Sequence, residues 1–499
     1  MISKKNIIYF FIFFFLYRFS LIYFNFNELR VVQLTSLQLE ALNNNFLETL
    51  WFFSTLPLGN LLVIKVSSYF SHIIELQYFF YTLNSLYIFL SIILFSRILF
   101  KINIKKNIII ILIILISILM IPYESWQPNH HDHINILIFT IIAYYLLFLI
   151  NDNKQNLSLL TLILLLLLLF NTLSIFFLLG LYIFILFFSK KKFFILNFIF
   201  ISIFILNMGV HLKNKINFNL FSATTVSSLN LIQKTVHAIG IHKFQNLLHE
   251  QKEIDQAIKD CYKSIYNDNK WYPEGRDNIV GQHFLALCFF DHKNNKYDYD
   301  KIINITNFED NKKLKKAIID DEFIFKNKRW LTQFGYSENN LKTAIYFQSI
   351  GPHIFFKALL KYPFEMIIGK VGAKGFFLTI MKSLSWGSIF PMDYQLNQYD
   401  WSYYNKIISQ LFRVINIIGL SLCVYYIPKT VIDSIKQKKI DKIDIYYLLL
   451  FFISSIFITL ISLITCCENP RHMVMIFFLI MIISLINYSK LIKDIKLKL

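Results

Sequence analysis

Two glutamates in the N-terminal part of this chain have a spacing that suits acid–base chemistry. Glu40 and Glu48 lie eight residues apart, just before an apolar stretch. Eight residues of helix make roughly two turns, so the two carboxylates would share one face. Paired acids can supply a general base and a metal ligand. A solvated helix face is the alternative interpretation.

A second polar segment runs from 121 to 133 and contains no Lys or Arg. Its ionisable side chains are Glu124, His130, His131, Asp132 and His133. Imidazole and carboxylate together suit a divalent cation such as Mg²⁺ or Mn²⁺, with Asp132 and His133 as ligands, although the spacing matches no standard zinc pattern. Recognition of phosphate or sugar hydroxyls, with His130 and His131 on a phosphate, is the favoured interpretation. A polar cap at a helix end is the third.

The third segment, 466–472, contains Glu468, Arg471 and His472 directly before the last apolar run. An arginine next to a long apolar run requires a partner for its charge, and a phosphate fits the guanidinium through two parallel hydrogen bonds. The segment therefore predicts a phosphate-binding Arg471 assisted by His472. An internal Glu468–Arg471 ion pair is the alternative.

The composition indicates that a membrane holds these segments. The chain has 499 residues, of which 56% are hydrophobic and only 16% charged, with 53 Phe and a mean hydropathy of +0.51. Such values exclude a soluble globular protein, a disordered chain and a collagen-like chain. The net charge of +19 comes almost entirely from Lys, and we interpret it as a signal of membrane topology rather than of nucleic-acid binding.

Apolar runs long enough to cross a bilayer predict an all-α polytopic membrane protein with about ten transmembrane helices. The predicted helices span 7–24, 78–96, 107–121, 133–150, 157–170, 173–188, 193–209, 407–427, 445–464 and 473–488. The apolar run 157–188 is divided at Asn171-Thr172, because a single helix of that length would overshoot the membrane. The first run is too long for a cleaved signal peptide and predicts a retained helix.

Lys and Arg concentrate in alternate connections, which predicts cytoplasmic N- and C-termini in a plasma (inner) membrane. The N-terminal transmembrane module would span 1–209 and include an outer loop, 25–77, in which 56–70 forms an amphipathic surface helix. An extracytoplasmic, mostly helical domain would span 210–405, with surface helices between 345 and 392 or, as the alternative, a membrane hairpin there. The C-terminal module, 406–499, would supply the last three helices.

The arrangement resembles the GT-C superfamily of membrane glycosyltransferases, which take sugars from polyprenyl-phosphate donors and include protein mannosyltransferases and aminoarabinose transferases. The resemblance covers most of the chain as architecture, with local similarity in 47–60, Pro122-Tyr-Glu-Ser-Trp126 and Glu468-Asn-Pro-Arg-His472. Family members usually carry an acidic pair where Thr35-Ser36 stands here, and a Pro-Pro pair of which Pro57 remains.

The resemblance implies sugar transfer from a polyprenyl-phosphate sugar to an extracytoplasmic lipid, glycan or protein, within membrane lipid and without nucleic acid. Glu40, Glu48 or Glu124 would act on the acceptor, and Arg471, His472, His130 and His131 would bind the donor phosphate. Two alternatives stay open: a lipid-linked glycan transporter, and a catalytically silent protein of this architecture. A transporter should carry polar residues in the middle of its crossings, but few lie there: Asn171 and Cys423 stand out, and Arg18 and Arg413 are the only charged ones. Polar residues gathered at one membrane face favour surface chemistry over transport.

Overall fold

The protein is described by a computed structural model, in which nearly all the described residues are helical. The structure describes residues 58–70, 76–126, 132–152, 157–170, 180–182, 193–218, 351–367, 401–437, 440–464 and 474–498, together with 12, 15, 42–44, 46–47, 50, 231, 235, 238–239, 243–244, 246–247, 290–291 and 296–297.

Eight described helices coincide in position with predicted crossings. They are α5 (Leu76–Lys101), α6 (Lys106–Trp126), α7 (Asp132–Asp152), α8 (Leu157–Phe170), α10 (Phe193–Phe218), α20 (Trp401–Ser421), α22 (Lys442–Ile464) and α24 (Phe477–Lys498). The predicted break at Asn171-Thr172 lies outside the described residues. The predicted crossings 7–24 and 173–188 lie almost wholly outside the described residues.

Five helical segments in the described part of the chain are long and apolar enough to cross a membrane. They are Thr82–Lys101, His133–Ile150, Phe194–Lys213, Gln410–Gln437 and Lys442–Thr459. Together with the composition, these segments indicate a membrane protein.

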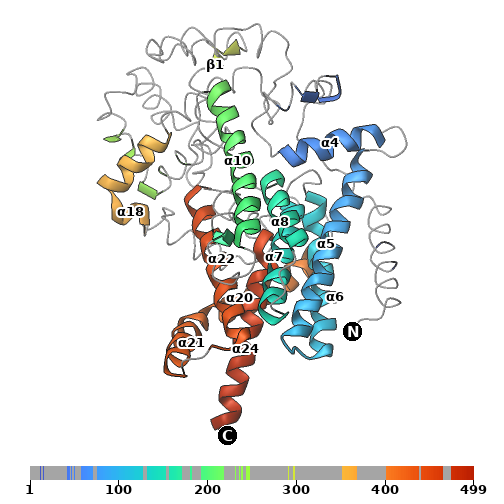
Figure 1. Ribbon diagram of the computed structural model, residues 1–499, viewed down its shortest axis with the longest axis vertical. Coiled ribbons are helices and arrows are strands. Elements are labelled where there is room, and N and C mark those ends of the chain that lie inside the picture. The colour runs from blue at the N-terminus through green and yellow to red at the C-terminus, as the bar shows by residue number, and fades with distance from the viewer. Residues whose placement is uncertain are drawn as a thin grey trace.

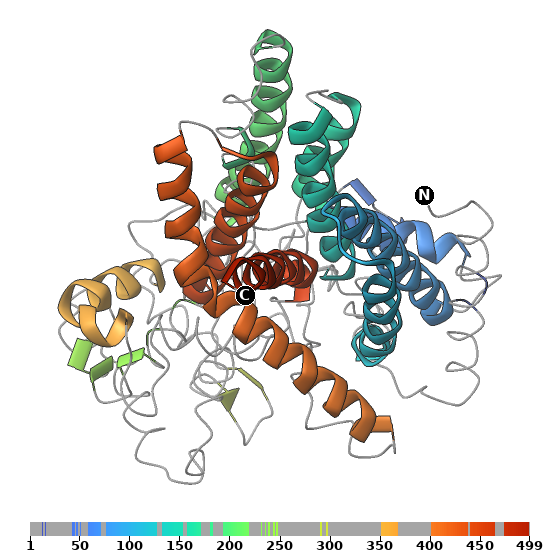
Figure 2. The same cartoon turned by 90° about the horizontal axis from the view of Figure 1, so that it is seen from below.

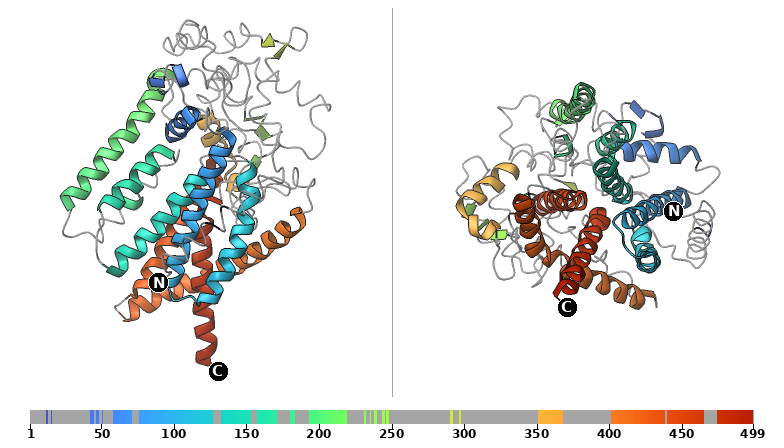
Figure 3. Two further views of the ribbon diagram at one scale, coloured as in Figure 1. Left: turned by 90° about the vertical axis from the view of Figure 1, so that its right-hand side faces the viewer. Right: turned by 60° about the horizontal axis from the view of Figure 1, so that its bottom comes forward.

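The helix α7 is the centre of the bundle and is buried along nearly its whole length. It packs against α5 and α8 on one side and against α22, α24 and the short 3₁₀ helix η4 (Val474–Ile476) on the other (Figures 1 and 3). The ring of Phe139 on α7 meets that of Phe457 on α22 at 5.0 Å, and Phe95 on α5 meets Phe478 on α24 at 4.9 Å. N-terminal and C-terminal helices therefore share one core.

The helices α20 and α24 approach each other closely where Gly419 faces Ser484. A Cβ atom added at Gly419 would lie 2.8 Å from the Cα atom of Ser484, so only glycine fits this contact. Beside it, the Asn487 amide donates to the Gly419 carbonyl at 2.7 Å and to Cys423 Sγ at 3.2 Å. Small residues and interhelical hydrogen bonds are the usual means by which helices associate in membranes.

The predicted crossing 407–427 is part of a longer, bent helical segment. After Ser421 the chain turns at Leu422 and continues as α21 (Cys423–Gln437), which runs away from the line of α20 (Figure 2). Pro428 lies inside α21 and removes one helical hydrogen bond there. The prediction ended this helix ten residues too early, because the charged residues that follow interrupt the apolar run.

Three smaller elements complete the described fold. The helix α4 (Leu58–Phe70) confirms the predicted helix at 56–70 and buries Gly59, Leu61 and Ile64 against α5 and α8. Within the predicted helical domain, residues 351–367 are helical and include α18 (Pro363–Ile367). The strands β1 (Phe290–Asp291) and β2 (Lys296–Tyr297) pair antiparallel in that same domain, which the sequence did not predict.

Candidate functional site

Most of the residues predicted to do chemistry lie outside the described part of the chain. These are Glu40, Glu48, His130, His131, Arg471 and His472. Glu124 lies near the end of α6 and Asp132 begins α7, but the described structure gives only their backbone. His133 is described in full, and its side chain is buried, with 1% exposure.

The end of the bundle where α4 lies is called here the α4 end, and the opposite end, where the chain finishes, the C-terminal end (Figure 1). The helix α6 ends and α7 begins at the α4 end, separated by residues 127–131 (Figures 1 and 3). The backbone of Glu124 and the side chain of His133 therefore belong to consecutive helices at one end, as the sequence predicted.

Phe170 connects α7, α8 and α4 at the α4 end. The Asn135 amide on α7 donates to the Phe170 carbonyl, the last residue of α8, at 3.2 Å. The ring of Phe170 in turn lies 2.6 Å from where a Cβ atom on Gly59 would stand, so α4 touches α8 there. Asn60, next to this contact, is also buried. The contacts fix α4, α7 and α8 relative to one another.

The segment that flanks Glu48 is held by α4 and α10. The Lys213 ammonium on α10 donates to the Leu50 carbonyl at 3.3 Å, and the Lys213 residue is only 8% exposed. On α4, Lys65 donates to the Asn43 carbonyl at 2.8 Å, and the Ser68 hydroxyl donates to Asn43 Oδ1 at 2.7 Å. Residues 43 and 50, on either side of Glu48, are thus bonded to helices at the α4 end.

Lys213 is a residue of interest that the sequence analysis missed. The predicted helix ended at 209, but α10 continues to Phe218 and carries Lys213 and the buried His211 in its last turns. His211 Nδ1 lies 3.0 Å from the carbonyl of Asn207. A histidine and a lysine directly after an apolar run were the signal that could have identified them.

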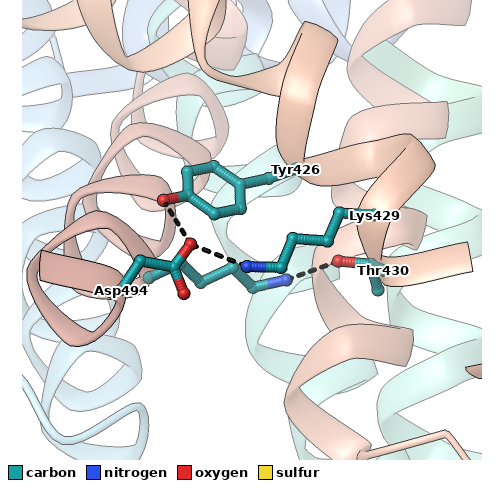
Figure 4. Close-up of polar contacts among 5 residues, drawn as sticks. Tyr426, Lys429, Thr430 and Asp494 are labelled. Atoms are coloured by element: carbon teal, nitrogen blue, oxygen red, sulfur yellow. Dashed lines mark hydrogen bonds and ion pairs between the residues drawn. The ribbon is translucent and has the colours of Figure 1, made fainter. Parts of the chain in front are cut away.

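Charged side chains at the C-terminal end form a cluster that ties α21 to α24 and α22 (Figure 4). The carboxylate of Asp494 accepts from Lys429 at 2.7 Å and from the Tyr426 hydroxyl at 3.2 Å. Lys490 donates to the Thr430 hydroxyl at 2.7 Å and pairs with Asp444 at 2.7 Å. From the sequence, these lysines were interpreted only as signals of membrane topology. In the structure, Lys429 and Lys490 connect helices.

The crossing helices contain more buried polar side chains than the sequence predicted. Asn84 on α5, Asn416 on α20 and Asn487 on α24 are all nearly inaccessible. Asn416 Oδ1 accepts from the Ser484 hydroxyl at 3.5 Å, so the α20–α24 interface is polar as well as close. These groups pack helices against each other within the apolar core.

No three His, Cys, Asp or Glu side chains of the described residues come together as a metal site. A scan against protein-family models, a search of curated proteins and a search of solved structures find no match to this chain. At the α4 end the buried Lys213 lies next to Leu50, two residues after Glu48 in the sequence, and the proposed chemistry starts from this end of the bundle.

Proposed function

We propose that the protein is an integral membrane glycosyltransferase that moves a sugar from a polyprenyl-phosphate donor to an acceptor at the α4 end. The observation that carries the proposal is the hydrogen bond from Lys213 to the Leu50 carbonyl. It brings the chain next to Glu48 to the end of the bundle where α6 finishes near Glu124 and α7 starts at Asp132. The proposal places the carboxylates of Glu48 and Glu124 at this end, next to the described Lys213.

The distribution of lysines supports the same orientation. The connection between α5 and α6, which contains Lys105, lies at the C-terminal end (Figure 1), as do Lys429 and Lys490. Lysine-rich connections are typical of the cytoplasmic side. The α4 end would then face outward, with both termini inside the cell.

In the proposed reaction, Glu48 or Glu40 takes the proton from the acceptor hydroxyl, and Glu124 orients the acceptor. The acceptor oxygen then forms a bond to the anomeric carbon while the bond from that carbon to the donor phosphate oxygen breaks. The electron pair leaves with the polyprenyl phosphate, whose charge Arg471, His472, His130 and His131 stabilise. A divalent cation, if bound by Asp132 and His133, would add charge stabilisation at the phosphate.

The test is transfer of sugar from a polyprenyl-phosphate donor by purified protein in vesicles. Glu48→Gln and Arg471→Ala should each abolish transfer. Glu48→Gln removes the base, which is worth roughly 10²–10⁴-fold in rate, and Arg471→Ala removes a charge-stabilising donor, which costs about 3 kcal/mol of barrier, roughly a hundredfold or more. Asp494→Asn, at the C-terminal end, is the control and should keep transfer. Wild-type rates in both active-site variants would reject the proposed roles.

A geometric test does not depend on finding the donor. Cysteine pairs at positions 48 and 124, and at 48 and 471, should cross-link with a short reagent, whereas a pair at 48 and 494 should not. Single cysteines at 44, 127 and 469 should react with an impermeant thiol reagent from the same side of the membrane. Position 48 remote from both partners, or on the opposite side, would exclude the transferase.

The buried Asn416 and Asn487 favour one alternative, a transporter of lipid-linked glycans, because polar groups inside crossings can line a passage. Their bonds to Ser484 and to the Gly419 carbonyl are those expected of helix packing instead. Flipping of a fluorescent lipid-linked sugar by wild-type protein, lost in Asn416→Leu, would favour transport over transfer. Donor binding without either activity would identify a catalytically silent protein.

A further inference from the structure

The segment formed by α20 and α21 is too long for one straight crossing. From Trp401 to Gln437 a continuous helix would measure ~55 Å, compared with a hydrocarbon core of ~30 Å. The bend at Leu422 divides the segment, and α21 leaves the line of α20 at the C-terminal end of the bundle (Figure 2). The helix α21 therefore does not continue α20 as part of one straight transmembrane helix.

The surface of α21 is divided into three faces. One face packs on the bundle through Cys423, Tyr426 and Thr430, which are buried. A second face is apolar and exposed, with Val424 at 82% and Ile435 at 71% exposure. At helical spacing the two residues fall on the same side of α21, together with Val431, which is also exposed. In water this face would be unfavourable.

The third face is charged, and Lys429, the partly buried Asp433 and Lys436 lie on it at helical spacing. Lys436 is exposed and borders the apolar face, and Lys493 and Lys496 are exposed on the neighbouring last turns of α24. The ion pair between Lys429 and Asp494 fixes these turns of α24 against α21. An apolar face bordered by lysines is the pattern of a helix that lies in the membrane–water interface and attracts anionic lipids.

We propose that α21 lies along the membrane surface at the C-terminal end, with its apolar face in the acyl chains, and that Lys436, Lys493 and Lys496 bind anionic lipid headgroups there. The Lys429–Asp494 and Lys490–Asp444 pairs hold the helix in this position by connecting it to α24 and connecting α24 to α22. The surface is independent of the chemistry proposed at the α4 end.

The depth of α21 in the bilayer is the first test. Single cysteines replace Val424, Val431 or Ile435 in full-length protein that lacks Cys261, Cys288, Cys466 and Cys467 and keeps the buried Cys423. Each is labelled with bimane and quenched by lipids brominated at different depths, with the parent protein as the labelling blank. All three labels should report the same shallow depth. A spanning α21 would separate positions 424 and 435 by ~16 Å, and labels quenched only from water would also overturn the proposal.

Lipid selectivity is the second test. In mixed vesicles, brominated phosphatidylglycerol should quench the label at position 435 more strongly than brominated phosphatidylcholine. Replacing Lys436, Lys493 and Lys496 by Gln should reduce this preference, by up to about fivefold for each lysine. Lys215→Gln, an exposed lysine near the end of α10 at the α4 end, is the matched control and should leave the preference unchanged. Equal quenching by both lipids in the parent would refute the lipid site.

Discussion

The two ends of the bundle are joined by different kinds of contact. At the C-terminal end, α21, α22 and α24 are connected by lysine–carboxylate pairs between side chains. At the α4 end, the side chains of Asn135, Lys65 and Lys213 bond to backbone carbonyls of neighbouring segments. A neutral backbone carbonyl can orient a lysine side chain, but unlike a carboxylate it does not neutralise the positive charge. At the C-terminal end the lysines are thus paired with carboxylates, whereas at the α4 end Lys65 and Lys213 keep their charge beside Asn43 and Leu50, two described residues that flank Glu48 in the sequence.

Glycine substitutions should give the largest difference in stability between the two ends of the bundle. Gly419→Ala should lower the free energy of unfolding by about 1–3 kcal/mol, because the added methyl group meets the backbone of Ser484. Gly59→Ala should cost less, because it meets the ring of Phe170, which can rotate. Thermal unfolding in detergent, followed by tryptophan fluorescence, measures both. Gly209→Ala, where no atom lies within 4 Å of the new Cβ, is the control and should cost nothing. An equal or larger loss at Gly59 would contradict the comparison.

Replacing buried asparagines should give the next largest loss of stability. Asn487→Leu removes donors to the Gly419 carbonyl and to Cys423 Sγ and should cost about 2 kcal/mol. Asn135→Leu removes one donor, to the Phe170 carbonyl, and should cost about 1 kcal/mol. Denaturant unfolding of the two variants, in the same detergent, gives the difference. If Asn135→Leu proves the more destabilising, the α4 end is the more tightly joined of the two.

The ion pairs of the C-terminal end should differ from each other in strength. In a double-mutant cycle, Lys490→Gln and Asp444→Asn should show a coupling of about 1 kcal/mol. The cycle of Lys429→Gln and Asp494→Asn should give about 0.5 kcal/mol, because the Lys429 side chain is more exposed, at 36% compared with 20% for Lys490. Added salt should reduce the second coupling more than the first. No coupling in either cycle would show that these pairs do not hold α21.

The smallest effect is expected at Lys65. Lys65→Gln weakens a partly exposed hydrogen bond to the Asn43 carbonyl and should cost about 0.5 kcal/mol. The expected readout is faster limited proteolysis near residue 43, with the melting temperature almost unchanged. Lys105→Gln, an exposed lysine at the C-terminal end, should leave the cleavage rate as it is in the wild type.

The helices of this protein were largely predictable, because the length of an apolar run directly limits a crossing. The prediction of 133–150 corresponds to α7, Asp132–Asp152, and that of 157–170 to α8, Leu157–Phe170. The hydropathy pattern did not predict the correct helix end where charged side chains are paired or buried. Because Lys429 has a carboxylate partner on α24, α21 continues through residues that hydropathy marks as a helix end.

The length and spacing of the apolar runs predicted only part of the candidate site. Sequence spacing placed Glu124 and His133 at one end of the bundle, since consecutive helices share the end where they are joined. It did not identify Lys213, because its bond to Leu50 connects residues far apart in the chain, and no local pattern specifies such a contact. The arrangement of Glu48 and Arg471 remains a prediction for the cross-linking experiment.

The central position of α7 has a consequence for biosynthesis. One side of α7 is covered by α22, η4 and α24, which are synthesised long after α7. Until they arrive, a helix that carries His133 and Asn135 must wait in the translocon or in contact with lipid. Truncation before α22 should therefore leave an insertion intermediate that quality-control proteases recognise, even though every earlier helix has already been made.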